Sequence, residues 1–331
     1  MPMPHPPRSN DTLPLAPTIP SDGPMLHFEW PALQIGVAEY PDGPTGCTVF
    51  TFPTGVTAGV DIRGGECGTM QTQHLESGDQ RIDALCFTGG SEYGFGAIAG
   101  VAAELLAQRG YSTAPDHLVQ VPGAVIYDFP LRDNAISPDA ALGRIAVRTA
   151  HPNWFPLGAR GAGCSAAVGV GFGFDQREAS GQGAAFRQVG DVKLAVFTVV
   201  NAIGAIVNRQ NHVVCGHRDP VTGQRHHAST DLERRLHQQQ STATDTGHHT
   251  TLTLCATNVA LPPRTLRQLG KQVHTSMARA IQPFHTIYDG DVFFTVTTEE
   301  VAHAPISEIA LGVLAAELAW DAVLSCIQPA I

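Results

Sequence analysis

The sequence predicts an α+β protein in which layered β-sheets are covered by buried helices. Short segments with the alternation or apolar runs typical of strands recur along the 331-residue chain, and helical segments are interleaved with them. The helical segment near the C-terminus, residues 306–327, is too apolar to lie on a surface. Charged residues make up only 15% of the chain, whereas 34 Gly and 24 Pro residues favour tight turns over long solvated helices.

The first two thirds of the chain predict several strands and one helix. The strands are bounded by Gly and Pro turns, and the last two are almost wholly apolar, so we expect them to be buried on both faces. They are expected at residues 34–38, 47–52, 57–63, 84–87, 121–129, 162–171 and 192–207. A helix rich in Ala and Leu is expected at residues 93–108.

The composition changes at residue 208. From there to residue 249 the chain is polar, rich in His and Gln and almost free of apolar residues, so burial cannot offset the ~1–2 kcal/mol per residue that ordering costs. We therefore expect a flexible linker at about 219–249. It lies inside a single domain, 26–331, which follows a Pro-rich tail, 1–25, that we expect to be disordered or draped. The remaining elements are expected as strands at 250–257 and 291–298 and helices at 262–281 and 306–327.

Charge and cysteine content exclude several classes of partner. A formal charge of -10 argues against a nucleic-acid partner, which requires a basic surface. The chain has two lysines, Lys193 and Lys271, and therefore no polybasic membrane patch, and no run approaches the ~18 apolar residues of a membrane span. Seven scattered cysteines without a CxxC pair indicate reduced thiols in a soluble, cytoplasmic protein.

We expect neither a metal nor a cofactor. Histidines gather between residues 212 and 249, but their spacing is irregular and no Cys or carboxylate set completes a site. The Gly-rich segment at 94–100 has the wrong last spacing for a dinucleotide loop, and the chain has no GxSxG nucleophile elbow.

The junction between His249 and Thr250 is the informative feature. A polar segment ends there, and a core strand begins directly at Thr250. One interpretation is an ordinary surface loop before an ordinary strand. The other is a processing site: a threonine hydroxyl lacks an adjacent base, and a freed α-amine on the same residue, with a pKa near ~7.7–8, would supply one.

Segments along most of the chain resemble the nylon-oligomer hydrolases. These 6-aminohexanoate-oligomer endohydrolases belong to the N-terminal-nucleophile peptidase family that also holds β-peptidyl aminopeptidases and D-aminopeptidases. The resemblance spans about residues 26–326, and it favours the processing site over the ordinary loop at the junction of His249 and Thr250. Its segments, in chain order, are Glu39-Tyr40, Gly43-Pro44-Thr45-Gly46, Thr88-Gly89-Gly90-Ser91, Tyr93-Gly94, Ala124-Val125-Ile126-Tyr127-Asp128-Phe129, Gly181-Gln182-Gly183-Ala184-Ala185-Phe186, Asn201-Ala202-Ile203-Gly204-Ala205-Ile206-Val207, Thr250-Thr251-Leu252, Ala256-Thr257-Asn258-Val259, Lys271-Gln272-Val273-His274, Ile281-Gln282-Pro283-Phe284-His285-Thr286 and Asp289-Gly290-Asp291.

The resemblance implies a four-layer αββα sandwich that is cleaved after His249 into an α fragment, 1–249, and a β fragment, 250–331. The two fragments would stay associated, and the αβ unit would form a homo-oligomer, expected to be a tetramer. The implied substrates are small amides: linear ω-amino-acid oligomers first, with small or β-peptides and amino-acid amides as the alternative. Acyl transfer of the ornithine acetyltransferase type is a further alternative.

The resemblance also implies the site residues, each with a structural alternative. Thr250 matches the nucleophile, and Asn201 matches an amide that steadies the carbonyl oxygen; the alternative for Asn201 is a structural hydrogen bond, since it interrupts an apolar strand. Tyr127 matches an active-site tyrosine or is a core aromatic. Asp289 and Asp291 match carboxylates near the new terminus, although Asp-Gly is also a turn dipeptide.

Two further features complete the predicted site. Gly89, Gly90 and Ser91 precede a helix and either offer backbone N–H groups to a substrate or form a tight turn. The family carries an active-site lysine after the motif that reads here Gly161-Ala162-Gly163-Cys164-Ser165, and this chain has none there. The missing lysine leaves a third alternative, a relic with weakened or lost catalysis.

Overall fold

The computed structural model describes residues 8–77, 80–171, 173–240, 249–303 and 305–327. The helices are α1 (Phe95–Gln108), α2 (Ala140–Arg148), α3 (Ala228–His237), α4 (Pro263–Ser276) and α5 (Glu308–Ser325). The longer strands are β2 (Gln34–Tyr40), β3 (Thr45–Ile62), β5 (Gln80–Thr88), β11 (Gln182–Val189), β12 (Val192–Asn201), β15 (Thr250–Val259) and β17 (Val292–Val301). The short strands are β1 (Met25–His27), β4 (Thr69–Met70), β6 (Gly123–Val125), β7 (His151–Pro152), β8 (Trp154–Pro156), β9 (Ala167–Val168), β10 (Glu178–Ala179), β13 (Ala205–Val207), β14 (Val213–Cys215) and β16 (Ile281–Gln282).

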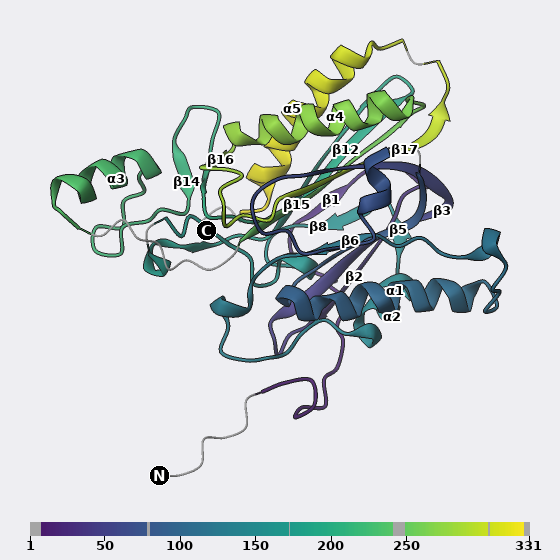
Figure 1. Ribbon diagram of the computed structural model, residues 1–331, viewed down its shortest axis with the longest axis horizontal. Coiled ribbons are helices and arrows are strands. Elements are labelled where there is room, and N and C mark those ends of the chain that lie inside the picture. Colours follow the sequence, from purple (N-terminus) through teal and green to yellow (C-terminus); the bar gives the residue numbers. More distant parts are fainter. Residues whose placement is uncertain (1–7, 78–79, 172, 241–248, 304, 328–331) are drawn as a thin grey trace.

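Three hydrophobic clusters separate four layers of structure. One lies between two sheet layers and holds aromatic side chains such as Phe50, Phe197 and Phe294. A second lies between β11, β12, β15 and β17 and the helices α4 and α5, and a third lies between β2, β3 and β5 and the helices α1 and α2. Figure 1 shows α4 and α5 on one side of the strands and α1 and α2 on the other. The predicted αββα sandwich is confirmed.

The long strand β3 joins the two sheet layers. Its first part, up to Thr51, pairs with β2 and β5, and its last part, from Thr57, pairs with β17. The sequence predicts two strands here with a turn at Pro53-Thr54-Gly55. The prediction of a turn is wrong. The register with β5 shifts between Thr51 and Val56, and Gly55 takes a positive φ of 68°, so this segment is a bulge within one strand.

The Gly-rich segment 162–171 is not the predicted strand. Only Ala167–Val168, strand β9, is extended. Gly161, Gly169 and Gly171 all take a positive φ, which interrupts an extended backbone. The predicted strand at 192–207 is divided into β12, which ends at Asn201, and β13, which begins at Ala205. Gly204 lies in the break, where the chain passes so close to Pro283 that a Cβ would lie 2.0 Å from its backbone oxygen.

The predicted linker contains regular structure that composition did not indicate. Strand β14 and helix α3 lie between residues 208 and 240. The helix is anchored by polar contacts rather than apolar burial: the buried Asp231 binds Arg234, Arg235 and the side chain of Gln176. Residues 241–248 of the predicted linker and residues 1–7 of the tail lie outside the described residues.

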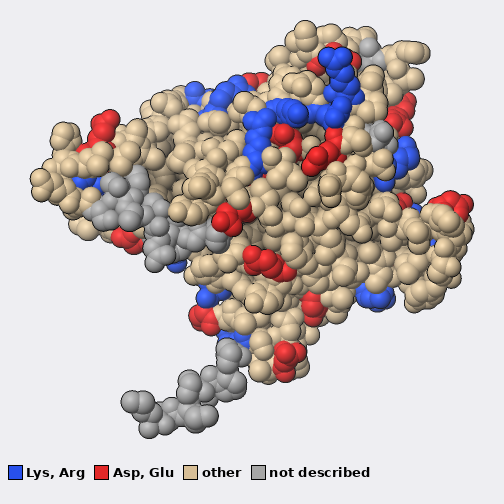
Figure 2. All heavy atoms as spheres, in the orientation of Figure 1, with Lys and Arg blue, Asp and Glu red and all other residues tan. Residues whose placement is uncertain are grey.

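Residues 8–24 of the N-terminal segment lie along the α1–α2 side of the molecule. Leu13 and Leu15 pack against the cluster under α1 and α2, and Thr18 pairs with Glu39 of β2. Among the described residues, no helix has the length and apolar character needed to cross a membrane. The face in Figure 2 carries charges of both signs, with Lys and Arg gathered over the layer of α4 and α5.

Candidate active site

Thr250 and Asn201 face each other across two neighbouring strands. They are register partners at one end of the β12–β15 pair. Side chains alternate between the faces of a strand, so Thr250 points the same way as Leu252 and Asn201 the same way as Val199, towards the space between the two sheets. Thr250 is 2% exposed, and Asn201 is fully buried. The sheet therefore places both side chains at the edge of the central core.

The side-chain amide of Asn201 is fixed at both ends. Its Oδ1 accepts a hydrogen bond from the Ala167 N–H at 3.1 Å, and its Nδ2 donates to the Tyr127 carbonyl oxygen at 3.0 Å. These bonds meet the predicted need for a partner in an apolar strand. The Nδ2 group carries two N–H bonds, so one of them remains for a second acceptor.

Backbone contacts hold Asp289-Gly290-Asp291 against a second loop. The Arg63 N–H donates to the Asp291 carbonyl at 2.8 Å, and the Glu66 N–H donates to the Asp289 carbonyl at 3.1 Å. Gly290 is required by close approach: a Cβ there would lie 2.1 Å from the Glu66 oxygen and 2.8 Å from the Thr250 hydroxyl oxygen. The Asp-Gly pair thus brings the backbone up to Thr250.

The two carboxylates are buried on either side of Gly290. The Asp291 Oδ1 accepts from the Thr251 N–H at 2.8 Å, one residue after Thr250, and its Oδ2 accepts from His285. Asp289 pairs with His249 in a parallel bridge, one residue before Thr250. Neither carboxylate is solvent-exposed.

The peptide bond between His249 and Thr250 is buried, and its carbonyl oxygen already accepts a hydrogen bond. His249 is 1% exposed, which differs from the solvated histidine that a linker predicts. The His249 carbonyl oxygen accepts a 2.6 Å hydrogen bond from the Gly290 N–H. The bond is therefore shielded from solvent in the uncleaved chain, which favours cleavage by groups already present over cleavage from outside.

A cavity of about 450 Å³ opens onto Thr250 and Tyr127. Burial, with Glu92 and Glu66 nearby, raises the pKa of the Tyr127 phenol, so it stays a donor at neutral pH. Burial and the neighbouring carboxylates raise the pKa of Cys67, in the same cavity, to about 12. Because the thiolate is the nucleophilic form, Cys67 does not compete with Thr250. No lysine or arginine is among the described residues that line this cavity.

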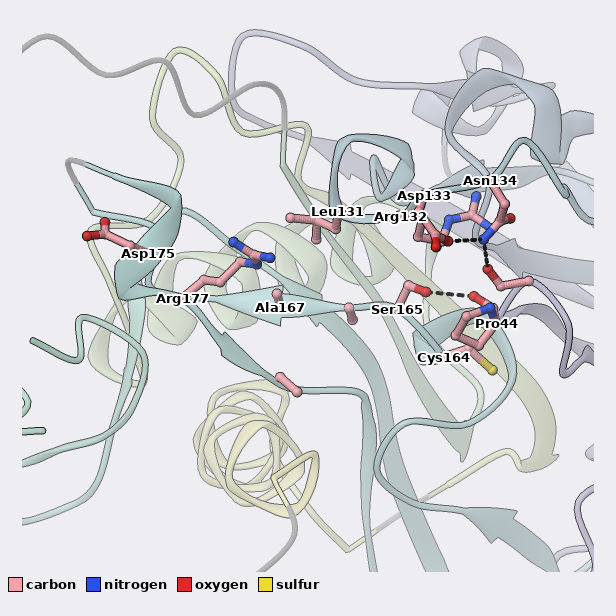
Figure 3. Close-up of a pocket in the computed structure, with 13 residues that line it drawn as sticks. Pro44, Leu131, Arg132, Asp133, Asn134, Cys164, Ser165, Ala167, Asp175 and Arg177 are labelled. Carbon is pink, nitrogen blue, oxygen red and sulfur yellow. Dashed lines mark hydrogen bonds between the residues drawn. The ribbon is translucent and has the colours of Figure 1, made fainter. Parts of the chain in front are cut away.

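A second cavity, of about 670 Å³, lies beside Ala167, whose N–H binds Asn201. Figure 3 shows Arg177 and Ser165 on either side of Ala167, with Leu131 and Arg132 above it. Thr250 and Tyr127 are not among its lining residues, so the smaller cavity is the candidate active site.

The structure does not support a role for Gly89, Gly90 and Ser91 as backbone donors to a substrate. Their N–H groups are used inside the protein, by the Gly46 carbonyl, the Asp128 carboxylate and the Ile126 carbonyl respectively. Gly90 has a φ of 87°, so the tight-turn alternative describes this segment.

The sequence assigns no role to four groups that the fold brings to the site. They are the Gly290 N–H, the His285 ring, and the carboxylates of Glu66 and Glu92. For Glu92 the sequence did offer a signal, because this residue directly follows the Gly-Gly-Ser turn that was predicted to lie at the site. Neither chain lysine replaces the missing one, since Lys193 lies at the far end of β12 and Lys271 on α4, and neither lines the cavity.

The pKa of Asp289 is raised to about 6, by burial first and by the charge of Asp291 second. Hydrogen bonds from the Thr286 and Ile203 N–H groups oppose the shift without cancelling it. The folded-state pKa thus exceeds the unfolded value of 3.8. Ionised Asp289 therefore destabilises the fold, a cost that is absent below pH ~4 and complete above pH ~6, where it reaches about 3 kcal/mol.

This shift predicts a pH-dependent gain in stability for Asp289→Asn in an uncleavable Thr250→Ala chain. The amide removes the charge but loses one accepted hydrogen bond, which costs about 1 kcal/mol. We expect the free energy of unfolding to rise by about 1–2 kcal/mol at pH 8 and to fall by about 1 kcal/mol at pH 4. Urea unfolding at both pH values measures this, and an equal change at both would show that Asp289 titrates normally.

Comparison with known proteins identifies the family. The model of peptidase family S58 matches residues 31–331. The chain belongs to peptidase family S58. Its relatives include 6-aminohexanoate-oligomer endohydrolases from Paenarthrobacter ureafaciens (43% identical over 325 residues) and an Agromyces strain (42% over 325 residues), each match covering 95% of this chain and 89% of the relative. An uncharacterised aminopeptidase of Mycobacterium bovis is 32% identical over 276 residues, which cover 78% of this chain and 75% of the relative.

Solved structures share the fold of this S58 peptidase. The L-aminopeptidase D-Ala-esterase/amidase of Ochrobactrum anthropi, described as a variant of the Ntn hydrolase fold, aligns with a TM-score of 0.64 and 15% identity, over 93% of this chain and 88% of that one. A Burkholderia β-aminopeptidase aligns with a TM-score of 0.61 and 17% identity, over 92% and 88%. The protein is therefore an amide hydrolase of the N-terminal-nucleophile type, as the resemblance implied.

Proposed function

We propose that this S58 peptidase cleaves itself between His249 and Thr250 and then uses Thr250 to hydrolyse linear amides that carry an ammonium group. The observation that carries the proposal is the hydrogen bond from the Gly290 N–H to the His249 carbonyl, 2.6 Å long, beside the Thr250 hydroxyl. It supplies an oxyanion donor at the bond to be cleaved, in a buried site where such donors act strongly.

In the first reaction the Thr250 hydroxyl oxygen attacks the His249 carbonyl carbon. The Gly290 N–H stabilises the oxyanion, and the hydroxyl proton is transferred to the departing Thr250 nitrogen. The C–N bond breaks and an ester forms. Water then hydrolyses the ester, which leaves a carboxylate on His249 and a free α-amine on Thr250.

Cleavage also relieves an electrostatic conflict. Asp289 and Asp291 lie buried close to each other, and the charge of Asp291 helps to raise the pKa of Asp289. A new α-ammonium on Thr250 would offset this repulsion. This site therefore accommodates the cleaved chain better than the intact one, even without the family lysine.

Turnover repeats the same ester chemistry with an external amide. The Thr250 amine accepts the hydroxyl proton, the hydroxyl oxygen attacks the substrate carbonyl, and the amine product leaves with that proton. The acyl-enzyme is again a Thr250 ester, so the Gly290 N–H and the free N–H of Asn201 serve its oxyanion as well. Tyr127 lines the same cavity, where its phenol is placed to donate to a bound substrate.

The acidic lining of the cavity favours substrates with an ammonium group. Glu66 and Glu92 lie at its exposed rim, and both raise the pKa of Tyr127, which lines the same cavity as Thr250. Linear ω-amino-acid oligomers such as 6-aminohexanoate oligomers carry such a group, as do the small and β-peptides that remain the alternative. The predicted tetramer of αβ units remains a prediction.

Neutralising the rim should weaken substrate binding selectively. We expect Glu66→Gln and Glu92→Gln each to raise KM for a 6-aminohexanoate dimer about 3–10-fold, with kcat changed less than about 2-fold, since exposed charge pairs contribute modestly. An N-acetylated dimer should show no change. Glu76→Gln, outside the cavity, is the control; an equal KM effect in all three variants, or on the acetylated dimer, would contradict ammonium recognition.

The function itself is tested by the intact mass of the purified protein. Two fragments, residues 1–249 and 250–331, together with amide hydrolysis, support the proposal. A single chain that never cleaves and shows no activity supports the relic alternative. A mass shift of an added amine acceptor would indicate acyl transfer instead of hydrolysis.

A further inference from the structure

His285 holds Asp291 by two hydrogen bonds. The Asp291 Oδ2 accepts from the His285 ring nitrogen Nδ1 at 2.8 Å and from the His285 backbone N–H at 3.2 Å. The other oxygen, Oδ1, accepts from the Thr251 N–H. With the Asp291 oxygen as acceptor, the ring takes the tautomer that carries its proton on Nδ1. The Asp291 carboxylate is thus fixed between the start of strand β15 and His285.

The backbone of His285 takes the left-handed conformation. Its φ is 59°, in a region that few residues other than Gly adopt and that His, Asn and Asp tolerate best. The Nε2 atom is buried and makes no hydrogen bond with any described residue. Among the described residues, the ring therefore makes one hydrogen bond, the one to Asp291.

A second histidine supports the ring from behind. The His274 ring meets the His285 ring edge to face, with centroids 4.4 Å apart, and its Nδ1 binds the Asp61 carboxylate at 2.9 Å. Asp61 in turn accepts from the Arg63 Nε at 2.7 Å. Burial lowers the pKa of His274 and outweighs Asp61, so His274 stays neutral and adds no charge beside His285.

We infer that His285 is a positioning residue that orients the Asp291 carboxylate for the new α-amine of Thr250. The inference rests on the proposed function. When the bond after His249 breaks, the amine appears one residue from the Thr251 N–H that Asp291 already holds. Without the Nδ1 donor, the Asp291 Oδ2 keeps only the 3.2 Å hydrogen bond from the His285 backbone N–H, and the carboxylate is held less firmly towards the amine.

Two substitutions separate the donor from the bulk of the ring. Asn and Asp both tolerate a positive φ, have the same size and lack the ring, but only Asn keeps an N–H at the Nδ1 position. We expect His285→Asn to cleave itself and to keep kcat within about 3-fold of wild type, whereas His285→Asp loses about 100-fold in kcat, since small displacements of a reacting group have effects of this size. Equal losses in both variants would overturn the inference, because they would indicate ring packing alone.

A stability measurement tests the contact without relying on activity. In the uncleavable Thr250→Ala chain, His285→Asp places a second carboxylate against Asp291, so its Tm should lie about 3–5 °C below that of His285→Asn. Equal Tm values would overturn the inference whether or not the wild type is an enzyme. If the Tm values differ but the wild type never cleaves, the contact stands and the proposed function fails, which also removes the role assigned to His285.

Discussion

Thr250→Ala is expected to leave one chain of 35.0 kDa without amide hydrolase activity, whereas the wild type yields two fragments. The substitution removes the hydroxyl that attacks the His249 carbonyl, and the buried bond is shielded from solvent. Intact-mass measurement of the purified protein gives the cleavage, and release of free amine from a 6-aminohexanoate dimer gives the activity. The loss in kcat should be at least about 10⁴-fold, the range seen when a nucleophile is removed.

The neighbouring Thr251 provides the matched control. Its hydroxyl oxygen is also buried, and it makes no hydrogen bond with the described residues. Thr251→Val therefore removes a hydroxyl of the same kind one position along β15 at little cost to the fold. This variant should cleave and turn over as the wild type does. A Thr250→Ala chain that still separates after His249, or still hydrolyses amides, would place the nucleophile elsewhere.

The parts of the fold that the sequence predicts well are those whose pattern is local. The alternation at 250–257 and the apolar run at 306–327 correspond to β15 and α5. The bulge at Gly55 in β3 was missed because nothing nearby in sequence distinguishes a bulge from a hairpin turn; only pairing with β17 continues the strand. Helix α3 was missed because ion pairs of Asp231, not apolar residues, stabilise it.

In the candidate site, too, the sequence does not indicate the features that depend on contacts between distant segments. The resemblance points to Thr250 and Asn201, and the sheet register explains why a residue near position 201 must lie beside position 250. The Gly290 N–H is invisible in a sequence because every residue except Pro has a backbone N–H; the parallel pairing of His249 with Asp289 makes it a donor to the bond to be cleaved. The contact of His285 with Asp291 is made in a left-handed backbone conformation that the sequence does not indicate.

Asn201→Asp is expected to lower kcat by about 10²–10³-fold, the effect of losing one oxyanion donor. The change keeps the size of the side chain and the oxygen that accepts from the Ala167 N–H. It replaces the Nδ2 donor by an oxygen that faces the Tyr127 carbonyl, so the fold should also lose about 1–3 kcal/mol. Single-turnover kinetics measure the chemical step, and urea unfolding measures the cost to the fold.

A second buried side-chain amide, which lies on β15, separates the effect on catalysis from the effect on folding. Asn258 lies at the opposite end of the strand, where its Oδ1 accepts from the Lys193 N–H and its Nδ2 donates to the Asp191 carbonyl, both at 2.7 Å. It therefore repeats the hydrogen bonding of Asn201 away from the cavity. Asn258→Asp should destabilise the fold to a similar extent and leave kcat unchanged. If the two variants lose equal activity, the loss reflects weakened folding, and the oxyanion role of Asn201 is wrong; if only Asn201→Asp does, its free N–H acts on the reacting carbonyl.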